Sequence, residues 1–357
     1  MKLSDIATLR LINQQILDPR LLTVKDLVGW MGAMQAQDYA MAKWAVGFRL
    51  PGLTDKSVET AFNKGEILRT HLMRPTWHFV SADDIYWMLT LTAPQVKAST
   101  NSRERELGLT GDIFTKSNSI IESALIGGKQ LIREELVVEL NRAGIATDEN
   151  RASHLFARAE LDGLVCSGAV QEGKQTYAIL AERVPKTKAL TREEALAKLA
   201  FKYFTSHAPA NLQDFTWWSG LSASDARAGL DIVKDRLSSE VIGGQTYWLP
   251  RDLIAPQTED AVFLLPAYDE YLISYRDRSA SLPSGYFRKL VSENGLFRPA
   301  VLINGQVIGL WKRTFKKDQV IVAFDFYEEP NPAVKEKIAQ AAQRFADFLG
   351  KKLVLAF

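Results

Sequence analysis

The chain repeats one order of predicted elements three times: three helices followed by two short strands. This order spans residues from about 3 to 82, from about 116 to 180 and from about 191 to 249, and each strand pair surrounds a turn signal such as Gly243-Gly244. Three helices and a two-stranded ribbon form the winged-helix variant of the helix-turn-helix, whose third helix can enter the DNA major groove. The repetition therefore predicts tandem winged-helix units.

The character of the sequence changes after about residue 258. Segments with the pattern of strands are followed there by a long amphipathic helix that opens at Pro332. We therefore predict an α+β fold with winged-helix units over residues 1–110, 111–188 and 189–257 and a mixed α+β domain over 258–357.

Composition excludes several classes of protein. Lys and Arg total 44 against 42 Asp and Glu, a net charge of +2, so any nucleic-acid contact must come from charge gathered on one face. The single cysteine allows no internal disulfide, and the four histidines lack the spacing of a zinc site. Because nucleotide-binding, nucleophile-elbow and HExxH motifs are also absent from the sequence, we predict no metal and no cofactor.

The start of the chain does not read as a secretory signal. Asp5 and Arg10 fall where such a signal needs an unbroken apolar run, and no later stretch reaches the roughly 18 apolar residues of a membrane span. We therefore expect a cytoplasmic protein without a membrane partner.

The segment MGAMQAQDYA places Gln35 and Gln37 two residues apart at the end of the second predicted helix. On a regular helix such side chains point about 200° apart, so the two amides converge only if the helix ends or unwinds there. Two amides that converge could form part of a functional site. The alternative is that both are surface or cap-region amides.

The predicted hairpin LRTHLMRPTWHFV carries Arg69 and His71 on one face of its first strand and His78 on its second. A turn centred on Arg74-Pro75 would place His71 opposite His78. The pair would then lie in a functional site or, alternatively, form a cross-strand polar pair or satisfied core histidines.

Positive charge gathers near the C-terminus. Residues 272–320 contain nine Lys or Arg against three Asp or Glu, a local net charge of +6. A predicted strand and turn in this region bear Lys312, Arg313, Lys316 and Lys317, which could track DNA phosphates or could simply form a solvated surface.

Four segments together resemble the AlkZ/YcaQ-like family of winged-helix DNA glycosylases: MQAQDYA, RTHLMRPTWHFV, LLPAYDEYLISYRDR and RPAVLINGQVIGLWKR. The resemblance covers essentially the full length. It implies three winged-helix units around a DNA-sized channel and excision of bulky N-alkylated purines, including one end of interstrand crosslinks. Gln35-Ala36-Gln37 matches the Gln-apolar-Gln motif of the AlkZ-like branch, although Ala36 is smaller than the usual aliphatic residue.

The resemblance also implies roles for individual residues. Gln35 and Gln37 would be catalytic, with Asp38 as the alternative carboxylate. The implied DNA-binding residues are Arg69, His71, Arg74, His78, Arg276, Arg278, Lys312, Arg313, Lys316 and Lys317. An alkylated purine is cationic and leaves without a strong general acid, so two neutral amides that hold a water could suffice.

We therefore predict a monofunctional DNA glycosylase for repair of alkylation damage, acting as a monomer on double-stranded DNA at the nucleoid. The alternative is a non-catalytic winged-helix DNA-binding protein or transcriptional regulator, because fold alone does not decide function. A regulator, or a family member that has lost its activity, would tolerate loss of Gln35 and Gln37.

Overall fold

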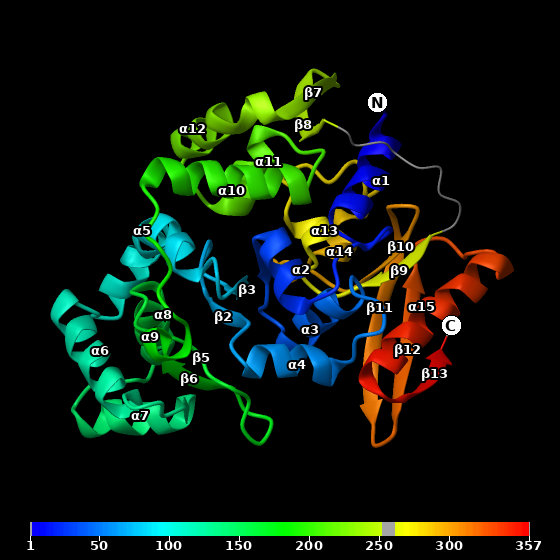
Figure 1. The fold of residues 1–357 in the computed structure, drawn as a ribbon. Coiled ribbons are helices and arrows are strands. Elements are labelled where there is room, and N and C mark those ends of the chain that lie inside the picture. The colour runs from blue at the N-terminus through cyan, green and yellow to red at the C-terminus, as the bar shows by residue number, and fades with distance from the viewer. Residues whose placement is uncertain (1, 252–260, 357) are drawn as a thin grey trace.

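The computed structural model describes residues 2–251 and 261–356. It mixes helices and strands, which confirms the predicted α+β class. Helices α2 to α4 lie in the middle of the molecule, α6 to α8 lie at one end, and the C-terminal sheet and α15 lie at the other, while α10 to α12 lie along the top (Figure 1). Within the described residues no helix is long and apolar enough to cross a membrane.

The first segment contains the predicted helices and hairpin together with a helix and a strand that were not predicted. Its elements are α1 (Leu3–Asn13), α2 (Val24–Met31), β1 (Ala33–Gln35), α3 (Tyr39–Gly47), α4 (Asp55–Asn63), β2 (Ile67–His71) and β3 (Trp77–Ser81). Thr23 caps α2 through its side chain, as its position predicts. The strand β1 extends the hairpin to a three-stranded sheet of order β1-β3-β2.

The hairpin register predicted from the sequence is wrong. His78 lies opposite Thr70, and His71 lies opposite Trp77, so the two histidines are not cross-strand partners. The connection between the two strands is centred on Arg74, and within it the Thr76 N–H donates to the Arg74 carbonyl at 2.6 Å across Pro75. A shift of one residue changes every pair in a strand.

The second and third segments follow the predicted order of three helices and a hairpin. The second contains α6 (Gly111–Leu125), β4 (Leu131–Ile132), α7 (Arg133–Arg142), α8 (Arg151–Leu161), β5 (Val165–Ser167) and β6 (Thr176–Ile179). The third contains α10 (Arg192–Ser206), α11 (Leu212–Ser219), α12 (Ala223–Val233), β7 (Leu237–Ile242) and β8 (Gln245–Pro250). Gly243 and Gly244 both adopt positive φ at the β7–β8 turn, as a tight hairpin turn requires.

Three further elements connect these segments. The helix α5 (Ile85–Glu106) leads from the first to the second, and α9 (Leu180–Arg183) follows β6. A short 3-10 helix, η1 (Lys234–Arg236), links α12 to β7. Neither α5 nor the other two connectors were predicted from the sequence.

The C-terminal segment forms a five-stranded sheet that is covered by a long helix. Its elements are β9 (Val262–Leu265), α13 (Glu270–Ile273), α14 (Phe287–Leu290), β10 (Ala300–Ile303), β11 (Gln306–Lys316), β12 (Gln319–Phe326), α15 (Pro332–Leu349) and β13 (Lys352–Ala356). The sheet order is β13-β12-β11-β10-β9, and β13 runs parallel to β12.

One detail differs from the predicted C-terminal segment, and one stays untested. The strand expected through AVFLLPAYDEYLI ends at Leu265, because Pro266 follows and Asp269 caps the short helix α13. The predicted boundary between residues 257 and 258 lies outside the described residues.

Hydrophobic packing joins segments that are distant in sequence. One core combines α2 to α4 with the C-terminal sheet and α15, where the Trp44 ring meets that of Phe345. A second core combines the β2–β3 hairpin and α5 with α10 to α12. The second segment packs around a cluster of its own, from Leu107 to Ile179. Division of the chain into four domains stays a prediction, and the first and last segments share one interior.

A buried ion pair also ties the first segment to the last. The Arg49 guanidinium binds the Asp269 carboxylate through two hydrogen bonds of 2.8 Å, and both side chains are fully buried. Such a pair is costly to bury and more costly to break, because the partner would be left as an isolated charge. It fixes α13 against the end of α3.

Candidate functional site

The QAQ segment begins at the end of a short strand that follows α2. The helix stops at Met31, and Gly32 turns the chain with φ 79° and ψ −63° into β1. Gln35 is the last residue of β1, and the chain bends at Gln37, so the helix has ended before both glutamines, as their convergence requires. Between them Ala36 is fully buried, while Gln37 is exposed.

The strand β1 fixes Gln35 against the hairpin. Gln35 pairs with His78 of β3, and the Ala36 N–H donates to the Trp77 carbonyl at 2.7 Å. Arg74, from the hairpin turn, donates from Nη2 to the Gln35 Oε1 atom at 3.3 Å. Gln35 is therefore held by backbone pairing and by a cation at its amide.

A buried carboxylate also binds the backbone of Gln35. Glu270, on α13, accepts the Gln35 N–H at 2.6 Å through Oε1, and its Oε2 accepts the Trp218 indole N–H at 3.1 Å and the Ser274 hydroxyl. Burial opposes the charge, but His207, Ser274 and Arg74 together lower the pKa of Glu270 to about 2. The carboxylate is therefore ionised at neutral pH.

Arg69 holds the segment around Gln37. Its guanidinium donates to the Ala36 carbonyl at 2.8 Å and to the Gln37 carbonyl at 3.3 Å. The same group donates to Gln175 Oε1 at 2.5 Å and lies 4.3 Å from the Trp77 ring centroid. Arg69 therefore connects the QAQ segment to the β5–β6 hairpin, and its donors are directed at protein acceptors.

Asp38 performs a structural task. It is the N-cap of α3, where Oδ1 accepts the Met41 N–H at 3.1 Å, and Oδ2 accepts a hydrogen bond from Arg313 Nη2 at 3.3 Å. Both carboxylate oxygens thus have protein partners. This arrangement favours Gln37 over Asp38 as the group that addresses a substrate.

The two hairpin histidines have different environments. The His71 Nδ1 atom lies 2.5 Å from Oε2 of the buried Glu160, which also accepts the His71 N–H at 2.7 Å. His78 is fully buried; burial, and then Arg74, lower its pKa to about 3, so its ring is neutral. Its Nδ1 donates to the Thr76 carbonyl at 2.9 Å. A fully buried ring cannot contact a DNA backbone, so the structure contradicts the DNA-contact role predicted for His78.

The two arginines of YRDR also differ. Arg276 is exposed at the surface. Arg278 donates to the Leu272 carbonyl at 2.7 Å and packs against the rings of Trp217 and Phe297, and burial lowers its pKa to about 10. Arg276 is thus accessible from solvent, whereas Arg278 supports the loop that carries it. Trp217 is 45% exposed beside Arg278, while Trp218 is buried.

The basic cluster lies on the hairpin formed by β11 and β12. Lys312, Lys316 and Lys317 are exposed, and the half-buried Arg313 reaches Asp38. The contact between Arg313 and Asp38 joins positions 275 residues apart, so it brings the basic hairpin next to the QAQ segment. Figure 1 shows this hairpin projecting from the C-terminal sheet.

Several residues around the site were not predicted to have roles. Glu270, Trp218, Glu160 and Gln175 each contact a predicted site residue or one of its direct partners. Glu270 lies in one of the segments that carry the family resemblance, but a lone acidic residue has no spacing that marks it. Their roles depend on contacts between distant parts of the chain, which no local pattern contains.

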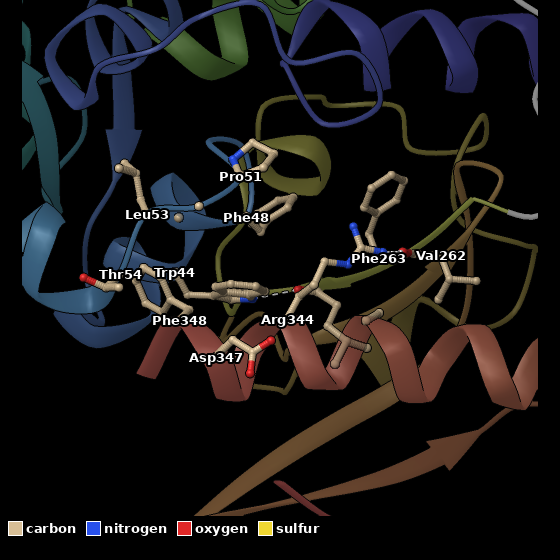
Figure 2. A pocket seen from close by; sticks show the side chains of 14 residues that line it. Trp44, Phe48, Pro51, Leu53, Thr54, Val262, Phe263, Arg344, Asp347 and Phe348 are labelled. Carbon is tan, nitrogen blue, oxygen red and sulfur yellow. Dashed lines mark hydrogen bonds between the residues drawn. The ribbon is translucent and has the colours of Figure 1, made fainter. Parts of the chain in front are cut away.

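Two cavities differ in their relation to these residues. An apolar cavity of about 370 Å³ lies between the α3–α4 connection, β9 and α15, where the Trp44 indole donates to the Leu264 carbonyl at 2.8 Å (Figure 2). Its lining includes none of the predicted site residues. A polar cavity of about 170 Å³ lies beside Arg69, lined also by Trp77, Glu160 and Tyr177. Only the second adjoins the QAQ segment.

No cluster of three or more His, Cys, Asp or Glu residues that could hold a metal ion occurs in residues 2–251 and 261–356. The groups around Gln35 and Gln37 are amides, guanidinium groups and one buried carboxylate. These amide, guanidinium and carboxylate groups can orient a water molecule and offset nearby charge, and they can hold a cationic base that leaves without strong acid catalysis.

Comparison with known proteins agrees with these features. Residues 28–348 match the family described as DNA glycosylase AlkZ-like. A relative from Streptomyces sahachiroi, named an interstrand DNA cross-link repair glycosylase, is 23% identical over 349 residues, which cover 93% of this chain and 94% of the relative. The solved structure of Streptomyces sahachiroi DNA glycosylase AlkZ has the same fold, with a TM-score of 0.83 at 20% identity over 100% of both chains.

The family match extends over most of the chain, so this protein belongs to the AlkZ-like DNA glycosylase family. The resemblance drawn from the four sequence segments is thereby confirmed. Its reaction class is that of a DNA glycosylase, and its partner is DNA.

Proposed function

We propose that this protein hydrolyses the N-glycosidic bond of purines alkylated at N7 or N3 in double-stranded DNA, as a monofunctional glycosylase. The observation that carries the proposal is that Gln35 and Gln37 lie at and just beyond the end of β1, in a segment that Arg69, Arg74 and Glu270 hold through hydrogen bonds. The β11–β12 hairpin contacts this segment through Arg313 and Asp38, and the exposed lysines of the same hairpin would meet the phosphates.

The chemistry requires little acid catalysis. Alkylation makes the purine cationic, so the bond from C1′ to the base nitrogen breaks with its electron pair leaving on the base, and the base departs neutral. The carbonyl oxygens of Gln35 and Gln37 would hold the water that attacks C1′ and would favour positive charge on the sugar. The products are a free base and an abasic site, and the proton that the attacking water gives up passes to solvent.

A site with two neutral amides would act only on purines that alkylation has already made good leaving groups. An unmodified guanine is a poor leaving group, and amides alone do not activate it. We extend the proposal to one end of an interstrand crosslink, because the Streptomyces relative is named for crosslink repair and a site on a surface strand does not require a deep base pocket. The protein would act as a monomer at the nucleoid.

The alternative of a non-catalytic DNA-binding protein or regulator has less support. Membership of a glycosylase family argues against it, and so does the network around Gln35. A regulator would have no need for an amide that is held by both an arginine and a buried carboxylate.

The test is release of free 7-methylguanine from methylated duplex DNA in single-turnover conditions. Gln35→Ala and Gln37→Ala should each lower the release rate at least about tenfold, equivalent to about 1.4 kcal/mol in the barrier. Gln340→Ala, which removes an exposed amide from α15, provides the control and should keep the wild-type rate. Folding and DNA affinity of all variants are measured in parallel.

Absence of release by the wild-type protein would contradict the proposal, provided that a bulkier N7 adduct and an interstrand crosslink also remain intact. Equal rates in wild type and both glutamine variants would instead place the catalytic groups elsewhere.

A further inference from the structure

The carboxylate of Glu270 is unusual because it is buried, ionised and bound directly to the candidate catalytic strand. The side chain belongs to α13 and lies 235 residues from Gln35, whose N–H it accepts at 2.6 Å. Its exposure is 1%. Burial of a charge is costly, and the carboxylate is stabilised by the three hydrogen bonds that it accepts from Gln35, Trp218 and Ser274.

The charge of Glu270 has one cationic neighbour that also contacts Gln35. Arg74 donates to the Gln35 Oε1 atom at 3.3 Å; burial lowers the pKa of Arg74 and the nearby Glu270 raises it. The Nε2 atom of His207 lies 3.8 Å from Glu270 Oε2; burial lowers the pKa of His207, and Glu270 raises it. Arg74 is the group whose charge acts on Glu270 and which also contacts the Gln35 amide.

A guanidinium at this place would by itself disfavour the proposed reaction. The substrate base is cationic, and positive charge develops on the sugar, so an unbalanced Arg74 would repel both. The Glu270 carboxylate supplies the opposite charge behind Gln35, on the protein side of the strand. Glu270 therefore holds the backbone of Gln35, and Arg74 holds its side-chain amide.

We propose that Glu270 is a positioning residue: it fixes the end of β1 so that Gln35 presents its amide, and its charge offsets Arg74 so that the site accepts a cationic base and a cationic sugar. This inference rests on the proposed function. It assigns to Glu270 a role in charge selection that a purely structural carboxylate would not have.

The first experiment is Glu270→Gln, which keeps the size of the side chain and removes its charge. The single-turnover rate of 7-methylguanine release should fall at least about tenfold, while affinity for undamaged duplex stays near the wild-type value. Glu104→Gln is the matched control, because Glu104 is also a buried carboxylate with a hydroxyl donor, Thr100, and a histidine neighbour, His154. Its release rate should equal that of the wild type.

The second experiment measures charge selection without turnover. Duplexes carry either a cationic pyrrolidine abasic analogue or the neutral tetrahydrofuran analogue, and the ratio of their dissociation constants reports the preference for positive charge. The wild type should prefer the pyrrolidine analogue, and Glu270→Gln should lose at least about tenfold of that preference. In Glu270→Gln combined with Arg74→Met, the preference should recover, because the unbalanced cation is gone.

Each outcome tests a different statement. The inference would be overturned if Glu270→Gln released base at the wild-type rate and kept the wild-type preference for the cationic analogue. It would also be overturned if Glu270→Gln lost affinity equally for both analogues and had a lower melting temperature. If the wild type releases no base but its cation preference depends on Glu270, the proposed function fails and the charge role stands. If neither release nor preference is seen, both fail.

Discussion

Asp38 lies directly after Gln37, yet its contacts are those of a helix cap. Because its side chain accepts the Met41 N–H of α3, Asp38→Ala should lower the free energy of unfolding by about 1 kcal/mol. Base release, at temperatures where the variant is folded, should stay close to the wild-type rate. Thr54→Ala, which removes the corresponding N-cap of α4, serves as the control and should have a similar effect on stability.

Denaturant unfolding and single-turnover release measure the two quantities. A fully folded Asp38→Ala protein that releases base as slowly as Gln37→Ala would identify Asp38 as the working carboxylate and contradict the assignment to Gln37.

His78 makes the stability of the protein depend on pH. Its pKa is about 3 in the folded state, where burial and Arg74 disfavour the charged ring, and about 6.5 in the unfolded chain. Between these values the unfolded state binds a proton that the folded state does not, so the free energy of unfolding falls as pH falls through this window. From about pH 6.5 to about pH 5, this one group should contribute a loss of about 2 kcal/mol.

Urea unfolding at a series of pH values tests this contribution. His78→Gln should flatten the pH dependence whatever its own effect on stability at neutral pH. His154→Gln, which alters a partly exposed histidine in the second segment, is measured alongside for comparison. Equal slopes in wild type and His78→Gln would show that the ring is charged, or solvated, in the folded state.

The β11–β12 hairpin joins an exposed basic strand to the candidate site. Lys312, Lys316 and Lys317 are exposed, so their combined replacement by glutamine should weaken binding to all duplexes regardless of sequence. The slope of log Kd against log salt should fall by about 0.9 for each phosphate that the variant no longer neutralises. Fluorescence anisotropy over a range of salt concentrations measures both quantities.

Lys352→Gln, on the edge strand β13, controls for removal of positive charge from the same sheet. Affinity and slope that match the wild type in the triple variant would remove this hairpin from the DNA interface.

Elements with a clear apolar stripe could be predicted from the sequence, and those without one could not. Helices such as α1, α2 and α4 combine regular apolar spacing with capping residues, so their presence was predicted. The helix α3 is buried on most sides and therefore lacks a polar face, and β13 exists only through parallel pairing with β12. The one-residue error in the hairpin register has a related origin, because the turn geometry around Pro75 is not contained in the alternation of the strands.

In the candidate site, too, some residues could be predicted from a local sequence pattern and others could not. Gln35 and Gln37 were found because their spacing belongs to a motif, and the end of α2 before them follows from Gly32. Glu270 contacts Gln35 across 235 residues and Glu160 contacts His71 across 89 residues, so only the folded chain reveals them.

At the scale of the whole molecule, the cores divide the protein differently from the repeats in its sequence. The first segment shares its interior with the C-terminal sheet, whereas the second segment has its own cluster around Leu140. Leu140→Ala should therefore destabilise the second segment by about 3 kcal/mol and accelerate hydrogen exchange there, with little change around α2 to α4. Mass spectrometry of exchanged peptides resolves the two regions.

Phe345→Ala provides the converse variant. It removes a ring from the shared core, so exchange should rise together in α3 and in the C-terminal sheet. Uniform acceleration over the whole chain by Leu140→Ala would contradict a separately stable second segment.

The single cysteine of the chain has a practical consequence. Cys166 is fully buried in β5, and burial raises the pKa of its thiol to about 12, so almost none is the reactive thiolate near neutral pH. Maleimide reagents should therefore label the native protein very little. A cysteine introduced for Phe315, which is 50% exposed on the basic hairpin, would take a fluorophore or a disulfide tether to a modified nucleotide at one defined position, and no native thiol would need to be removed. The approach of this hairpin to a damaged duplex can then be followed as it happens.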